Sequence, residues 1–110
     1  MRSFKDLAIW KRSFELVDKI YDQSNLLPKD EKFGLASQIK RSAVSIPSNI
    51  AEGCSRKTNK EVARYLEIAI GSAFELETQI LIAEKRKMLD KANIAPIPVS
   101  YTHLTLPTKA

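Results

Sequence analysis

Three stretches of the chain place apolar residues three and four positions apart, which is the spacing that puts them on one face of an α-helix. They predict helices over about residues 5–25, 31–52 and 59–89. The predicted apolar face of the first helix is Leu7, Trp10, Phe14, Val17 and Tyr21. Between the first two helices, Pro28 disfavours helical geometry at the residue before it, and Asp30 is suited to cap the second helix.

The second predicted helix contains a proline in its interior. Its apolar face is Leu35, Ile39, Ala43, Ile46 and Ile50. Pro47 has no N–H and leaves the carbonyl four residues earlier without its usual partner. The helix either ends near Ile46 and restarts with Ser45 as its cap, or continues with a bend, and the freed carbonyl then binds a hydroxyl, an amide such as that of Asn49, or water. Because the apolar face keeps its phase across the proline, we favour the continuous helix.

The third predicted helix has a clear start, because Thr58 and Glu61 form the capping-box pattern T-x-x-E. Its apolar face is Val62, Leu66, Ala69, Ala73, Leu76, Ile80 and Ala83, widened by Phe74, Leu81 and Ile82. Two glycines are assigned structural roles. Gly53 stands where a left-handed residue often closes a helix, and Gly71 belongs to a small-residue patch that we expect to face the second helix.

The periodic pattern stops soon after Asp90, which could cap a fourth helix. We therefore predict an all-α fold, an up-down four-helix bundle with three helices here plus a truncated fourth, in one domain over residues 1–97.

The last residues, 98–110, are interpreted as a non-native tail. The segment VSYTHLTLPT, residues 99–108, matches the translation of a transposase-type sequencing adapter. Pro98 and Lys109 fit the codons that the two ends of the adapter would leave. The alternative is a natural polar tail.

The composition is that of one folded domain: 110 residues, 44% hydrophobic and 28% charged. The net charge of +5 favours anionic partners such as nucleic acid, although it also serves solubility. Cys54 is the single cysteine and cannot form an internal disulfide, which points to a reducing compartment. No apolar run approaches the roughly 20 residues that span a bilayer. We expect a cytoplasmic protein without membrane contact.

The residues for catalysis or metal binding are sparse. Di-iron bundles use a Glu-x-x-His motif on each of two helices, and the sequence has none. Phosphate-binding loops of the G-x-x-x-x-G-K-S/T and G-x-G-x-x-G types are also absent. Cys54 has no histidine partner outside the tail, which holds the single histidine, His103. We expect no enzymatic activity, no cofactor and no metal.

Basic residues are the most informative polar group. The candidate nucleic-acid-binding residues are Lys40, Arg41, Arg56, Lys57, Lys60 and Arg64. Lys60 and Arg64 are four apart and share one helical face. These residues are either an ordinary solvated face or a salt-sensitive phosphate-binding surface. No aromatic residue lies between them in the sequence, so stacking of single-stranded bases is not expected.

Several segments resemble one known family. They read FGLASQIKRSAVSIPSNIAEG, then SRKTNKE, then YLEIAIGSAFELETQILIA, after an opening FKDLAIWKRSFELVDKIY. Over about residues 4–89 the chain resembles the four-helix-bundle family of large-subunit rRNA intervening-sequence proteins, and it is also similar to the accessory variability protein of diversity-generating retroelements.

The resemblance implies an up-down four-helix bundle and a homo-oligomer, a pentameric ring. In the retroelement branch it also implies nucleic-acid binding and partnership with a reverse transcriptase. By position, the basic pair of the second helix is Lys40 and Arg41, and SRK before the third is Ser55, Arg56 and Lys57. Two hypotheses stay open: a non-enzymatic oligomer that binds RNA or DNA, and a structural or protein-interaction module that does not.

Overall fold

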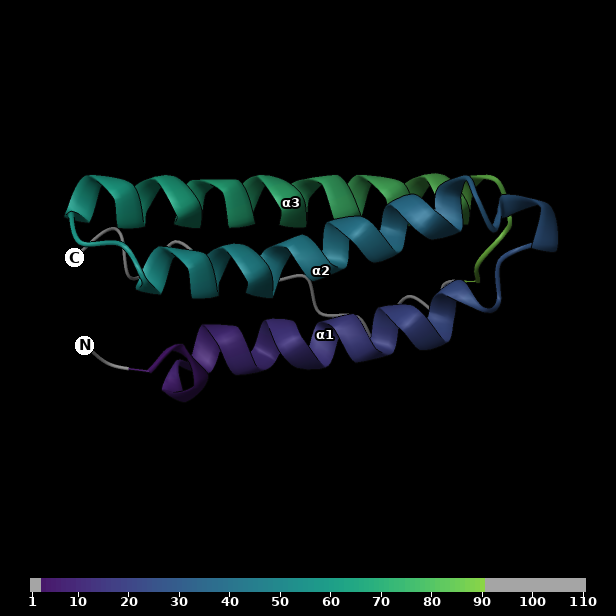
Figure 1. The fold of residues 1–110 in the computed structure, drawn as a ribbon. Coiled ribbons are helices and arrows are strands. Elements are labelled where there is room, and N and C mark those ends of the chain that lie inside the picture. Colours follow the sequence, from purple (N-terminus) through teal and green to yellow (C-terminus); the bar gives the residue numbers. More distant parts are fainter. Residues whose placement is uncertain (1–2, 91–110) are drawn as a thin grey trace.

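Three antiparallel helices form the part of the chain that the computed structural model describes, residues 3–90. The elements are a short 3₁₀ turn at Phe4–Asp6, α1 at Ala8–Ser24, a second 3₁₀ turn at Lys29–Glu31, α2 at Leu35–Cys54 and α3 at Asn59–Lys85. Figure 1 shows α2 between α1 and α3, and α2 packs against both. Within residues 3–90 there is no strand, which confirms the all-α prediction. The fourth helix and the non-native tail that the sequence predicts both lie outside these residues.

The core is built from the predicted faces of α2 and α3. The buried apolar residues of these helices are Ala36, Ile39, Ala43, Ile46, Ile50, Leu66, Ala69, Ala73, Leu76, Ile80 and Ala83. The prediction that Phe74, Leu81 and Ile82 widen the buried face of α3 is wrong, because all three side chains are exposed. The many alanines allow the backbones of α2 and α3 to approach closely, so the narrow face alone fills the space between them.

The buried face of α1 differs from the predicted one. Leu16 and Ile20 enter the core together with Ser13 and Ser24, whereas Phe14 is 57% exposed. The serines can be buried because each hydroxyl donates to a carbonyl of its own helix, Ser13 Oγ to Trp10 O and Ser24 Oγ to Tyr21 O, both at 2.9 Å. A hydrophobicity pattern that treats serine as solvent-facing therefore predicts the wrong buried face for α1.

Pro47 lies inside α2, which continues without interruption (Figure 1). The alternative in which the helix stops near Ile46 is thereby excluded. Asn49 supports the backbone here: its amide Nδ2 donates to the carbonyl of Ser45 at 2.7 Å and to the Ser45 hydroxyl at 2.9 Å. This differs from the expectation, because the amide binds the Ser45 carbonyl and not that of Ala43, the carbonyl that Pro47 leaves without its N–H partner.

The two glycines with predicted structural roles have different surroundings. Gly53 does not close α2, because the helix continues through Cys54 and no described glycine has a positive φ. It is a close-approach position instead: a Cβ added there would lie 3.1 Å from the Cβ of Tyr65 on α3. The prediction that Gly71 faces α2 is also wrong, because Gly71 is exposed and an added Cβ would meet no atom within 4 Å. Its neighbours Ser72 and Ala73 are the ones that face α2.

The helix ends show where local chemistry overrides periodicity. At the start of α2, the side chain that accepts a backbone N–H is Glu31 rather than the predicted Asp30: its Oε1 accepts from the Leu35 N–H at 3.0 Å. The helix begins at Leu35, four residues later than predicted. At α3, Thr58 is the N-cap and accepts from the Glu61 N–H at 3.2 Å, as the capping-box pattern predicted. The end of α3 lies at Lys85 rather than near residue 89, because Lys87 turns left-handed at φ 62°.

No helix among residues 3–90 is both long enough and apolar enough to cross a membrane.

Candidate nucleic-acid interface

The six predicted basic residues fall into two groups. Lys40 and Arg41 lie in the first half of α2, whereas the other four surround the turn between α2 and α3 and are called the turn cluster: Arg56, Lys57, Lys60 and Arg64. The two groups are about 20 Å apart along the α2 axis, at about 1.5 Å per helical residue. The six candidate residues therefore form two sites with different surroundings.

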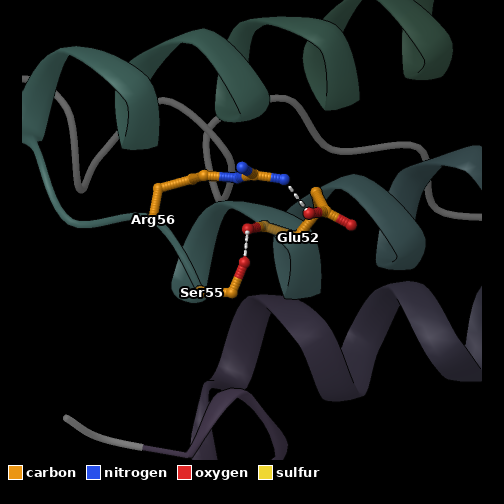
Figure 2. A network of polar contacts seen from close by, with 3 residues as sticks. All are labelled: Glu52, Ser55 and Arg56. Atoms are coloured by element: carbon orange, nitrogen blue, oxygen red, sulfur yellow. Dashed lines mark hydrogen bonds and ion pairs between the residues drawn. The ribbon is translucent and has the colours of Figure 1, made fainter.

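One member of the turn cluster has a local counter-charge. Figure 2 shows the guanidinium of Arg56 turned toward the carboxylate of Glu52, with which it forms an ion pair. The Arg56 guanidinium also lies over the Tyr65 ring, 4.9 Å from its centroid. The hydrogen bond that Arg56 donates to the Glu52 carboxylate raises the pKa of Arg56 above its ordinary value. Arg56 is thus held at the end of α2, and its charge is already balanced.

The other three members of the turn cluster present uncompensated charge. Lys57, Lys60 and Arg64 are exposed, and none forms an ion pair with another residue of the described range. The carboxylate of Glu61 beside them is engaged by the Thr58 hydroxyl, which donates to it at 3.0 Å. Three cations on the turn and the first turns of α3 can each contact a phosphate without first breaking a salt bridge.

Lys40 and Arg41 line a groove between α1 and α2, which we call the α1–α2 groove. It has a volume of about 580 Å³, and its lining residues are Tyr21, Lys32, Phe33, Ser37, Lys40, Arg41, Val44 and Ser45. The Lys40 ammonium lies 5.2 Å from the centroid of the Tyr21 ring, and the Lys32 ammonium lies 5.4 Å from that of Phe33. Three cations and two aromatic rings therefore share one depression, and none of its lining residues is acidic.

The aromatic members of this groove were not found by sequence reasoning, which expected no aromatic residue beside the basic ones. Tyr21 comes from α1 and Phe33 from the connection before α2, so they meet Lys40 and Arg41 only through antiparallel packing. The one local signal is the pair Lys32–Phe33, next to each other in the sequence.

Cys54 lines a second, apolar cavity of about 330 Å³ where α1, α2 and α3 converge. Burial raises the pKa of its thiol, so the neutral, weakly nucleophilic form predominates at neutral pH. Within residues 3–90, no three histidine, cysteine or acidic side chains gather as metal ligands would.

Fold and surface together define a small helical-bundle protein that carries two cationic sites. The model of the family described as 23S rRNA-intervening sequence protein matches residues 5–105. The chain therefore belongs to the 23S rRNA-intervening sequence protein family, as the resemblance in its sequence indicated. The matched region includes both cationic sites. A comparison with curated proteins finds no match.

Proposed function

We propose that this protein is a non-enzymatic, oligomeric, cytoplasmic helical-bundle protein that binds RNA or DNA through its basic surface. The observation that supports it best is the turn cluster, in which Lys57, Lys60 and Arg64 are exposed and have no carboxylate partner within residues 3–90. Unpaired cations on a rigid helix start give electrostatic affinity for phosphates with little sequence specificity.

Replacing Lys57, Lys60 and Arg64 together by alanine should weaken nucleic-acid binding at every sequence tested. The slope of log affinity against log salt concentration becomes less steep by about one for each phosphate contact that is lost. The slope of the triple variant should therefore be less steep than that of the wild type by about three. Gel shifts over a salt series measure both quantities.

The matched control removes three exposed lysines elsewhere, Lys5, Lys11 and Lys29, and makes the same change in net charge. A turn-cluster variant that binds like the wild type would contradict the proposal. So would an equal loss in both variants, because binding would then reflect net charge alone.

A second candidate function is a structural or protein-interaction module without direct nucleic-acid binding, with further copies of the chain or a reverse transcriptase as its partner. It is favoured by the apolar side chains that α3 exposes, which are Ile68, Phe74, Leu81 and Ile82. Gly71 lies among them with open space beside it. Exposed apolar surface of this kind is typical of protein–protein contacts.

On this second function, light scattering should give a mass several times the 12.4 kDa of one chain. The double variant Phe74→Asp and Leu81→Asp should then lower the mass toward that of a monomer, because buried carboxylates are costly at an interface. The control places the same two charges on exposed α2 positions, Gln38→Asp and Ser48→Asp, and should keep the wild-type mass. A wild-type protein that is monomeric at micromolar concentration would rule out the oligomer.

A further inference from the structure

The α1–α2 groove combines features that the turn cluster lacks. The turn cluster offers exposed charge, whereas the groove offers cations together with aromatic faces inside a depression. Phe33 is 90% exposed, the highest value among the large apolar side chains of the described residues. An aromatic ring left this open in water loses the free energy that covering it would provide. The groove is therefore suited to a ligand that brings both a flat apolar face and a negative charge.

We propose that the α1–α2 groove binds an unpaired nucleotide of a single-stranded nucleic acid, with a base stacked on Phe33 and the adjoining phosphates bound by Lys32, Lys40 and Arg41. This inference rests on the proposed nucleic-acid binding and names the kind of strand that one of the two sites accepts.

The geometry supports a base rather than a simple anion. Both ammonium groups lie against rings, that of Lys32 at 5.4 Å from the Phe33 centroid and that of Lys40 at 5.2 Å from the Tyr21 centroid. Each ammonium lies over one face of its ring, and because the Phe33 side chain is 90% exposed, a base can stack on the opposite face of that ring with its phosphates near Lys32, Lys40 and Arg41. The volume of about 580 Å³ lies in the usual range for small-ligand pockets, roughly 300–1,000 Å³.

Charge complementarity also favours this occupant over an apolar protein segment. The lining contains three cations and no carboxylate, and the hydroxyls of Ser37 and Ser45 add polar edges. An apolar helix docked here would have to remove three charges from water without compensation. A duplex is disfavoured for a different reason, since its bases are stacked inside and cannot reach Phe33.

The test measures binding of labelled single-stranded RNA, single-stranded DNA of the same sequence, and the corresponding DNA duplex by fluorescence anisotropy. Wild-type protein should bind both single strands more tightly than the duplex. The variant Phe33→Ala should weaken single-strand binding about 5- to 150-fold, the usual range for loss of one stacked base. Duplex affinity and the salt slope should not change, because no charge is removed. The side chain is almost wholly exposed, so the variant is expected to fold.

Phe14→Ala is the matched control, because it removes a half-exposed aromatic ring from α1 instead. An equal effect of Phe33→Ala and Phe14→Ala, or an equal loss for single strands and duplex, would overturn the inference. So would a change in oligomeric mass on Phe33→Ala with single-strand affinity intact, which would assign the groove to a second copy of the chain. Failure of the wild-type protein to bind any of the three nucleic acids would instead refute the proposed function itself.

Discussion

Replacing Leu76 by alanine should lower the free energy of unfolding by about 2–5 kcal/mol, the largest effect we expect from a single substitution in this chain. Leu76 is 0% exposed and lies near the middle of α3, where it packs within the core shared by the three helices. Truncation removes buried methyl groups and leaves a cavity that rigid neighbouring helices can close only in part. Since small domains are stable by only about 5–15 kcal/mol, the variant should unfold at a clearly lower urea concentration.

The matched control is Leu26→Ala, which makes the same chemical change at a side chain that is 54% exposed. Urea unfolding followed by helical circular dichroism should show a shift of less than about 1 kcal/mol for this variant. Similar losses in both proteins would mean that Leu76 is not part of a packed core, and the bundle described above would be wrong at its centre.

The sequence predicted α2 and α3 well because their buried faces consist almost entirely of aliphatic residues at helical spacing. Ile39, Ala43, Ile46 and Ile50 are all buried as expected, and the phase is unaffected by Pro47. For such faces, the burial of apolar area outweighs the other contributions to the free energy of folding, so the spacing of apolar residues alone identifies the core.

The face of α1 could not be predicted in the same way, because two of its four buried positions are serines. Ser13 and Ser24 satisfy their hydroxyls on their own helix and so enter the core at little cost. The aromatic residues that the pattern placed inside then lie at or near the surface, and Tyr21 reaches the α1–α2 groove from there. The misjudged phase of α1 therefore hid Tyr21 from the candidate site, whereas Phe33 meets Lys40 and Arg41 only because the helices pack in antiparallel order.

The basic residues were identified from the sequence, but their grouping was not. Charge pattern shows which residues are cationic, whereas pairing depends on distances that only the folded chain sets. Arg56 is balanced by Glu52 one helical turn away, while Lys57, next to it in the sequence, has no such partner within the described residues. Adjacent basic residues of one motif can therefore differ in whether their charge is already paired with a carboxylate.

Polar contacts between α2 and α3 were also beyond sequence reasoning. Ser42 Oγ donates to Gln79 Oε1 at 2.9 Å, and the Ser45 and Ser72 hydroxyls lie 2.8 Å apart. Ser42 and Gln79 are both buried, and they are 37 positions apart in the sequence. Since a slide of one helix along the other would separate these partners, the contacts help to fix how α2 and α3 are aligned.

Replacing Ser42 by alanine should therefore lower the free energy of unfolding by about 1–3 kcal/mol, because the buried Gln79 carbonyl loses its hydroxyl donor. Ser13→Ala is the matched control: it removes an equally buried hydroxyl, but one that donates only to a carbonyl of its own helix. That change should cost much less, because the Trp10 carbonyl lies within α1 and keeps its backbone partner one helical turn later when the hydroxyl is removed. Urea unfolding of both variants measures the difference.

The double variant Ser42→Ala and Gln79→Leu separates the loss of a hydrogen bond from the loss of a side chain. With both polar groups gone, no buried acceptor is left unpaired, so the double variant should be more stable than the sum of the single changes implies. Two results would show that the contact does not stabilise the α2–α3 pairing. One is a double variant whose loss of unfolding free energy equals the sum of the two single losses; the other is a Ser42→Ala effect as small as that of Ser13→Ala. The apolar faces alone would then determine how the two helices align.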